Sequence, residues 1–507
     1  MSEKRFVWLG RYAFVLTVLY AGGMFWLVPH PPMADLPQHA GQVALWRDLL
    51  LDESPWQSLM RINYFTPYLL GYGLALVLSF LIPIAAALKL LLMLAYYAFV
   101  FGCVKLRRHF QGDHRLDWLF IPGFFGAAYV WGMFSFLIAA PIGLAFVLLA
   151  DRYATTPTKA SGVVVCLLGV LLFFSHGLVF LFACAIGIAF LVVRQRRLAR
   201  LCLALLPYVP LGTLSIIYAL MKRESESFAS TVFPPGEIFW GWDLRRLVLP
   251  GHIFGGYDLQ GAVFAGTATV LMLWAPRLLA SKLNLREPSS LVPMAMFLLV
   301  WLVMPFYAMQ ITFLYLRFAL FALPFYALVF CRTALPIKTN LNNDMQPRVA
   351  QWMMALLCWI FLAGMTDRLV RFAQETKDYE TVQAAAEPGQ RALALIFDAD
   401  SPASKNPWAY LHYPLWYQAE RRGLVDFNFA WALPMVVHYE KAQRPPVDPD
   451  WESHIFDWSR HGGKQYRYFF IRNTQPLPVD LFKNDQCHVE LLKSAGHWSI
   501  YEASRCH

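Results

Sequence analysis

Residues 118–150 read Trp118-Leu-Phe-Ile-Pro-Gly-Phe-Phe-Gly-Ala-Ala-Tyr-Val-Trp-Gly-Met-Phe-Ser-Phe-Leu-Ile-Ala-Ala-Pro-Ile-Gly-Leu-Ala-Phe-Val-Leu-Leu-Ala150, which is 33 residues without a charge. A single helix of this length would measure about 50 Å, but the hydrocarbon core of a bilayer is only about 30 Å thick. The run therefore predicts a tight helical hairpin that turns near Trp131 and Gly132. A second apolar run of the same length, 161–193, predicts another hairpin that turns near Ser175–Gly177.

The rest of the first 366 residues follows the same pattern. The chain is 58% hydrophobic and 15% charged, whereas soluble domains are about 25% charged. Eight further apolar runs are 8–28, 66–82, 84–104, 201–220, 261–276, 291–308, 314–331 and 350–366. Together the runs predict an all-α polytopic membrane domain with about eleven transmembrane helices.

The charged residues divide the chain after Thr366. Residues 1–366 hold 27 Lys and Arg against 15 Asp and Glu, whereas residues 367–507 hold 16 against 18. The first part reads as a membrane domain and the second as a small water-soluble α/β domain. The net charge of +10 therefore belongs to the membrane part, and nucleic acid is not the expected partner.

The basic residues also predict an orientation, because cytoplasmic loops of membrane proteins are rich in Lys and Arg. If 66–82 does not cross the membrane, 19 basic residues lie inside and 7 outside. The N-terminus is then cytoplasmic, and residues 29–83 and 221–260 form outside loops. The 367–507 domain is extracytoplasmic, and the expected location is a bacterial inner membrane.

The tail shows the pattern of a mixed domain. Strands are predicted at 391–397, 466–471, 487–492 and 498–502, and an amphipathic helix at 408–422. Cys487 and Cys506 are the only cysteines of the tail and are candidates for a disulfide in an oxidising compartment. The tail contains no Gly-rich phosphate loop, HExxH or CxxC motif, so we expect it to support or recognise something rather than to catalyse alone.

The loop after the first apolar run is the most informative for chemistry. It reads Pro31-Pro-Met-Ala-Asp35-Leu-Pro-Gln-His39, so a helix that starts near Asp35 would place Asp35 and His39 on one face. A carboxylate there suits removing a proton from a sugar hydroxyl or holding a divalent metal such as Mg²⁺ or Mn²⁺. The alternative is that Asp35 is only a turn cap. The sequence points to no certain cofactor.

This loop resembles the Asp-x-Pro-x-His loop of bacterial glycosyltransferases of the C superfamily (GT-C), which are polytopic and use polyprenyl-phosphate-linked sugars outside the cytoplasm. The segment Tyr129–Phe136 is similar to a second region of that superfamily, with Ser135 where Asn is often seen. The exported tail that follows the last span also resembles the superfamily. The resemblance implies that Asp35 is catalytic and that His39 orients Asp35 or helps to bind metal.

A polyprenyl-phosphate donor needs cationic or donor groups near the outer interface. Arg317, at the outer start of a span, and His176, at the turn of the second hairpin, are candidates for contacts to the phosphate or the sugar. The alternatives are that Arg317 is a snorkelling interfacial residue and that His176 is a core residue bonded to a carbonyl.

The outside loop 221–260 supplies further candidates for donor binding, which are Arg245, Arg246, His252 and Asp258. The same loop contains Trp240 and Trp242, whose rings could stack on a sugar. Interfacial Trp residues are, however, expected at any membrane boundary.

Three functions are compatible with these patterns. The first is a glycosyltransferase that moves a sugar from a polyprenyl-phosphate donor to a lipid, glycan or protein acceptor. A transporter or flippase of lipid-linked saccharides would need charge deep in the spans, where Lys89 is the main candidate. A glycan polymerase or ligase would typically have paired arginines in a large outside loop late in the membrane part. Arg245 and Arg246 match this feature only weakly.

Overall fold

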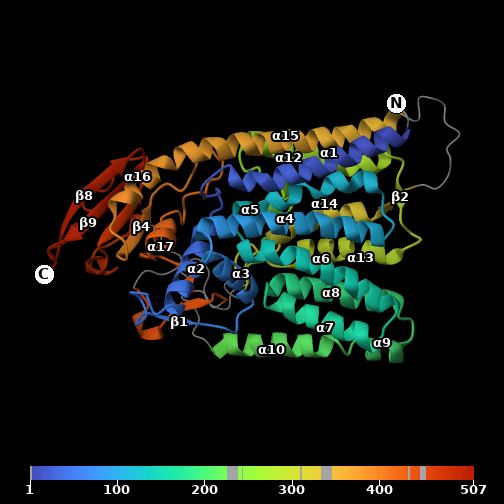
Figure 1. Cartoon of the computed structure of the whole chain (residues 1–507), viewed down its shortest axis with the longest axis horizontal. Coiled ribbons are helices and arrows are strands. Elements are labelled where there is room, and N and C mark those ends of the chain that lie inside the picture. The colour runs from blue at the N-terminus through green and yellow to red at the C-terminus, as the bar shows by residue number, and fades with distance from the viewer. Residues whose placement is uncertain are drawn as a thin grey trace.

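The computed structural model describes residues 3–224, 238–242, 244–308, 311–332, 345–431, 434–445 and 453–507. Residues 225–237 and 243 of the 221–260 loop therefore lie outside the described residues. The molecule is elongated, with a bundle of helices along its length and a β-sheet at one end (Figure 1). The first helix begins at the end of the bundle opposite the sheet, and the C-terminus lies beyond the sheet.

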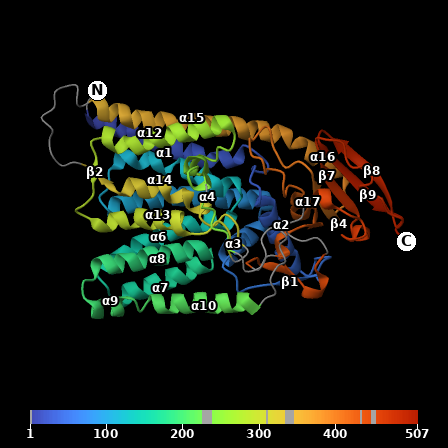
Figure 2. The ribbon, with the colours of Figure 1, turned by 180° about the vertical axis from the view of Figure 1, so that it is seen from behind.

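Apolar helices build the bundle. They are α1 (Glu3–Gly23), α4 (Ile84–His109), α6 (Phe134–Thr155), α7 (Lys159–Phe173), α8 (Gly177–Arg194), α9 (Leu198–Ala204), α10 (Tyr208–Glu224), α12 (Leu259–Leu278), α13 (Val292–Val303), α14 (Ala319–Leu328) and α15 (Met345–Glu375). Shorter helices, α2 (Leu36–Leu50), α3 (Leu69–Ser79), α5 (Ala127–Val130) and α11 (Leu249–Phe254), complete this part. Seen from behind, α15 again runs along the whole bundle toward the sheet (Figure 2).

Within the described ranges, five helices are long and apolar enough to cross a membrane. They are α4, α6, α8, α12 and the stretch Pro347–Ala385, which joins α15 to α16 (Lys377–Ala385). The count rises to six if α9 and α10, bent by 58° at their junction, form one broken span. The apolar stretches Leu69–Ser79, Lys159–Phe173, Pro288–Val303 and Leu316–Leu328 are helices of only 10–17 residues, so the count of about eleven crossings stays a prediction.

The first predicted hairpin is wrong in its first half. Instead of one helix before Trp131, the chain forms two 3₁₀ helices, His114–Phe120 and Pro122–Phe125, and then the single turn of α5. Glycines there allow close backbone packing, because a Cβ on Gly123 would lie 2.8 Å from the Leu320 carbonyl oxygen. Apolarity alone cannot separate such a packed irregular segment from a spanning helix.

The second hairpin agrees with the sequence pattern, since α7 ends at Phe173 and α8 begins at Gly177. The run 66–82 contains only α3, whose 11 residues would extend about 16 Å. That length is too short to cross a bilayer and matches the expectation that this run does not cross.

The tail folds around a five-stranded mixed sheet of order β5-β4-β7-β9-β8. Its strands are β4 (Arg391–Ile396), β5 (Leu424–Asp426), β7 (Tyr468–Arg472), β8 (His488–Ala495) and β9 (Trp498–Ser504). The β4 strand is parallel to β5 and β7, whereas β7 and β8 are antiparallel to β9. The helix predicted at 408–422 is shorter than expected, because α17 covers only Leu415–Arg421. Cys487 and Cys506 are joined by a disulfide.

The tail and the membrane part are interleaved. Strand β1 (Met60–Ile62), from the first outside loop, pairs with β6 (Val437–Tyr439) of the tail. The α2 helix packs against α17, and its Gln42 side chain accepts from and donates to the backbone of Val437. The change of composition after Thr366 falls inside α15, so it does not coincide with a break in the backbone.

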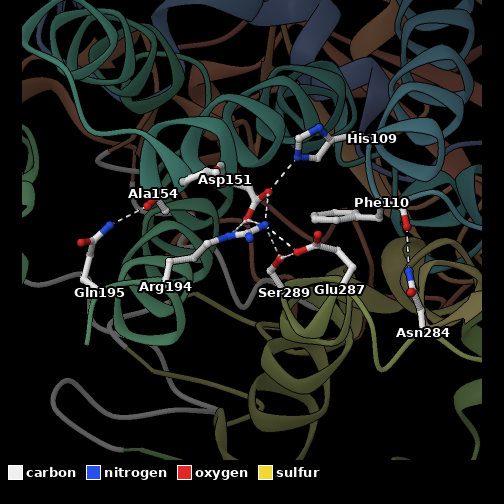
Figure 3. A network of polar contacts seen from close by, with 10 residues as sticks. His109, Phe110, Asp151, Ala154, Arg194, Gln195, Asn284, Glu287 and Ser289 are labelled. Carbon is white, nitrogen blue, oxygen red and sulfur yellow. Dashed lines mark hydrogen bonds and ion pairs between the residues drawn. The ribbon is translucent and has the colours of Figure 1, made fainter. Parts of the chain in front are cut away.

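At the other end of the bundle, ion pairs tie the helix ends together. Asp151 of α6, which has no exposed surface, accepts hydrogen bonds from Arg194 at 3.0 Å and contacts His109 Nε2 at 2.7 Å. Arg194 also donates to Glu287 and Ser289, each at 2.7 Å (Figure 3). The basic loops predicted to be cytoplasmic therefore also hold α4, α6 and α8 in register.

We expect Asp151→Asn to destabilise the protein, because it leaves the partly buried Arg194 without its full counter-charge. Breaking a buried pair typically costs about 3–5 kcal/mol. The matched control is Asp367→Asn, which removes an exposed pair with Arg371 and should cost at most about 1 kcal/mol. Thermal unfolding in detergent measures both variants, and equal midpoints for the two would contradict the role given to Asp151.

Candidate active site

Asp35 lies where the first outside loop enters α2, and the backbone around it is fixed by the loop before α6. Its N–H donates to the Trp131 carbonyl at 3.1 Å, and the Ala34 N–H donates to the Val130 carbonyl at 3.0 Å. Gly132 adopts φ +73°, and a Cβ at this glycine would lie 2.7 Å from the Asp35 nitrogen. This close approach requires glycine, since both the space and the positive φ exclude a side chain.

The carboxylate of Asp35 is placed in a poorly solvated position. Only 23% of its side chain is exposed, and burial raises the pKa of Asp35 to about 7, while the charge of Arg317 acts in the opposite direction. Asp35 forms no side-chain cap hydrogen bond with α2, so the turn-cap alternative is not what the structure shows. A carboxylate with a pKa near 7 can both accept and release a proton at neutral pH.

Arg317 brings a cation to this carboxylate from a different part of the chain. It lies in a short 3₁₀ helix, Leu316–Phe318, just before α14, and its guanidinium donates to the Thr312 carbonyl at 3.0 Å. Its Nε is buried and, among the described residues, has no hydrogen-bond partner. A buried guanidinium donor without an acceptor suits an anionic ligand such as a phosphate.

His39 lies one turn beyond Asp35 on α2, but its hydrogen bonds go elsewhere. Nδ1 lies 2.6 Å from the Tyr72 hydroxyl oxygen, and the ring also bonds to the backbone of Gly132. Burial is the main cause that lowers the pKa of His39 to about 3, so the ring is neutral at physiological pH. These contacts hold the ring between α2, α3 and the loop before α6.

His176 completes the group of sequence-predicted residues that the fold brings together. Its Nδ1 accepts a hydrogen bond from the Leu178 N–H at 3.2 Å and so caps α8, which leaves the proton on Nε2. The ring packs against Tyr68 at 5.0 Å between centroids. The charge of Arg317 acts on both His176 and His39, so the two histidines lie within the same electrostatic environment as Asp35.

The paired arginines of the second outside loop have structural contacts. Arg246 is buried, and its guanidinium donates to four backbone carbonyls, those of Trp240, Gly241, Trp301 and Met304. The guanidinium of Arg245 lies over the rings of Phe239 and Phe306, at 5.5 and 5.1 Å from their centroids. Trp240 and Trp242 are 45% and 68% exposed.

The contacts of Asp258 and His252 are with residues other than Asp35. The Asp258 carboxylate caps α12 by accepting from the Gly261 N–H at 3.1 Å, and it lies 3.6 Å from Arg368. His252 is buried beside the rings of Tyr257 and Trp301. Among the described residues, no hydrogen bond or ion pair joins Asp258 or His252 to Asp35.

The structure adds His412, a residue that the sequence analysis missed. Its Nε2 lies 3.5 Å from Asp35 Oδ1, although the two residues are 377 positions apart in the sequence. The sequence pattern places His412 inside a predicted amphipathic helix, where nothing separates it from other tail histidines. Only the docking of the tail on α2 reveals the contact.

The donor set does not make a dedicated metal site. In the part of the chain that the structure describes, no group of three or more His, Cys, Asp and Glu residues could hold a metal ion. Asp35 and His412 offer two ligands. A magnesium or manganese ion therefore stays a prediction.

Two solved protein structures are similar to this chain. It is similar to the arabinofuranosyltransferase AftD from Mycobacteria, with a TM-score of 0.48 and 12% identity over 99% of this chain. It spans about 40% of the length of AftD. It is also similar to ArnT from Cupriavidus metallidurans, whose structure holds undecaprenyl phosphate, with a TM-score of 0.40 and 11% identity over 99% of this chain and 98% of ArnT.

No family model and no curated protein matches the chain. At these TM-scores and identities, neither likeness assigns a residue role or an activity to this chain.

We expect Gly132→Ala to destabilise the protein by about 1–3 kcal/mol, because alanine at φ +73° is strained and its Cβ would collide with the Asp35 backbone. The matched control is Gly364→Ala in α15, where a Cβ meets no atom within 4 Å. Alanine there should leave stability unchanged or raise it by up to about 1 kcal/mol. Unfolding midpoints in detergent test this, and a Gly132→Ala protein as stable as the control would rule out the packing described.

Proposed function

We propose that this protein is an integral-membrane glycosyltransferase of the GT-C type. It transfers a sugar from a polyprenyl-phosphate donor to a lipid, glycan or protein acceptor on the extracytoplasmic face. The observation that carries the proposal is a mostly buried Asp35 carboxylate, whose pKa is raised to about 7, that lies within electrostatic reach of Arg317, a residue with an unsatisfied guanidinium donor. A base beside an anion-binding group is what glycosyl transfer from a phosphate requires.

The reaction follows from these two groups. A hydroxyl oxygen of the acceptor attacks the anomeric carbon of the donor sugar and forms the new glycosidic bond. The bond between that carbon and the phosphate oxygen breaks, and the phosphate leaves with the electron pair. Asp35 takes the hydroxyl proton. Because phosphate is already a good leaving group, the main contributions of the protein are positioning and base assistance.

The phosphate is expected to bind on the side of Asp35 where Arg317 lies. The Nε of Arg317 supplies a charge-assisted hydrogen bond, and the Nε2–H of His176 supplies a second donor, since its Nδ1 is already used in capping α8. The aromatic surroundings of His176, which include Tyr68, suit the first isoprene units of the donor lipid.

The site lies at the end of the bundle that meets the tail (Figure 1). By the basic-loop argument this end is extracytoplasmic, and the end with the Asp151 network is cytoplasmic. The tail would then cover the site from outside the membrane. A bacterial inner membrane is the compartment that this orientation fits.

Lys89, the charged residue within a span that would favour a transporter, has a structural contact. The Lys89 ammonium is buried and donates to the Val28 carbonyl at 2.9 Å, while it lies 5.0 Å from the centroid of the Trp26 ring. Lys89 therefore ties α4 to the start of the first outside loop. This contact supports a structural tether more than an ion pathway.

We expect Asp35→Asn to abolish transfer, because the amide keeps the shape of the carboxylate but cannot take a proton. The loss should be at least about a hundredfold. The measurement is mass analysis of surface glycans and glycolipids in a strain that lacks the gene and expresses either wild type or variant. Asp52→Asn, at an exposed loop carboxylate, is the control and should restore the product fully. A fully active Asp35→Asn protein would refute the proposed site.

The pH dependence tests the roles of Asp35 and Arg317 together. Because the base must be deprotonated, kcat/KM should rise as the pH increases through about 7, the pKa of Asp35. Arg317→Gln removes the charge that lowers this pKa, so the acid limb should move to higher pH, and the KM for the donor should rise. Arg371→Gln, at a side chain that is 67% exposed, should change neither quantity. An unmoved acid limb in Arg317→Gln would disprove the electrostatic coupling.

A further inference from the structure

The tail touches the backbone that holds Asp35. Asn406 Nδ2 donates to the Pro32 carbonyl at 2.9 Å and to the Val130 carbonyl at 3.3 Å. The Val130 carbonyl is the same group that accepts from the Ala34 N–H. A side chain of the tail therefore bridges the two membrane-side segments that meet at Asp35.

Aromatic packing fixes the same tail segment in a second place. The Trp408 ring stacks on Trp131 with 4.4 Å between centroids, and Trp131 in turn lies 4.1 Å from the Phe313 ring. Trp131 supplies the carbonyl that binds the Asp35 N–H, so the stack acts on the residue that orients Asp35. On its other side the segment enters the core of the tail, where Tyr413 is 1% exposed.

His412 lies in the chain between Trp408, which stacks on Trp131, and Tyr413, which is buried in the tail. It packs on Phe427 and Phe429, with 6.2 and 5.7 Å between centroids. The Phe429 N–H donates to Gln38 Oε1 at 2.8 Å, so this support is itself attached to the first turn of α2. Only 15% of the His412 side chain is exposed, and its Nε2 lies 3.5 Å from Asp35 Oδ1.

We infer that His412 is a positioning residue for the proposed transfer reaction, and that through it the C-terminal tail completes a site otherwise built by the membrane part. The Nε2–H of a neutral His412 donates to Asp35 Oδ1 and holds the carboxylate toward the acceptor hydroxyl. The inference rests on the proposed role of Asp35 as base. It gives the tail a defined task in the reaction, in place of a general role in support.

The charges around Asp35 explain why a neutral donor is useful. Besides His412, the titratable groups that act on the carboxylate are Arg317 and Tyr72. Burial lowers the pKa of His412 to about 3, so the ring donates a hydrogen bond without adding a second positive charge. A donor to the charged form of an acid lowers the pKa of that acid, so we expect removal of the His412 donor to raise the pKa of Asp35. The 3.5 Å separation is at the outer limit of a hydrogen bond, as is common before substrate binds.

The test compares two substitutions of His412 in the full-length protein. His412→Phe fills the volume of the ring but removes the donor, whereas His412→Gln keeps an N–H donor of similar reach. Activity is measured on membranes as formation of the glycan product that the deletion strain lacks, at several donor concentrations and at pH values from 5.5 to 9 by about half-unit steps. His497→Gln, at an exposed tail histidine, is the control.

We expect His412→Phe to lower kcat by about ten- to a hundredfold with little change in KM, and to move the acid limb of the pH profile upward. His412→Gln should recover most of the lost turnover and most of the shift, and His497→Gln should match wild type. Loss of activity in both His412 variants with an unmoved acid limb would overturn the inference and indicate a purely structural role. A His412→Phe protein with wild-type kcat would overturn it as well.

The two proposals fail in different ways. If Asp35→Asn is inactive while His412→Phe retains wild-type kcat and pH profile, only the role of His412 is wrong. If Asp35→Asn is active, the proposed function itself fails.

Discussion

The site depends on one constraint, which is the backbone clamp on the chain that enters α2. The N–H groups of Ala34 and Asp35 bind the carbonyls of Val130 and Trp131, and Asn406 of the tail binds the same Val130 carbonyl. Each partner comes from a different region of the sequence, so the clamp forms only when all three regions have folded against one another. Buried carbonyls and amides near a membrane interface must be paired, and here the pairing also fixes the direction of a carboxylate.

Electrostatics at this point is a balance of opposing effects. Removal of water favours the protonated form of Asp35, whereas the guanidinium of Arg317 favours the carboxylate, and the outcome is a pKa near neutrality. A fully exposed Asp35 would have a low pKa and would be a weak base. A buried Asp35 without a nearby cation would stay protonated at neutral pH. The same guanidinium keeps an unused donor, so one side chain can serve both the base and an anionic ligand.

The sequence predicted much of the fold from period and composition. The α7–α8 hairpin, the short non-crossing α3 and the principal strands of the tail all lie where apolar runs and turn residues placed them. The helix predicted over 118–130 was wrong, because Pro122 and the neighbouring glycines let the chain pack there as short 3₁₀ helices and turns. The paired Arg245 and Arg246 illustrate a related limit, because side chains that looked available are bonded to carbonyls or lie over rings.

The sequence by itself determined that most of this protein is membrane-embedded, how its basic loops are distributed, and that an acid follows the first apolar run. These are local properties, set by the transfer of side chains out of water and by the spacing of residues along the chain. Only the tertiary structure decided which groups surround that acid. Arg317 and His412 lie near Asp35 because segments hundreds of residues apart pack together. A pattern within a short stretch of sequence cannot predict such long-range contacts.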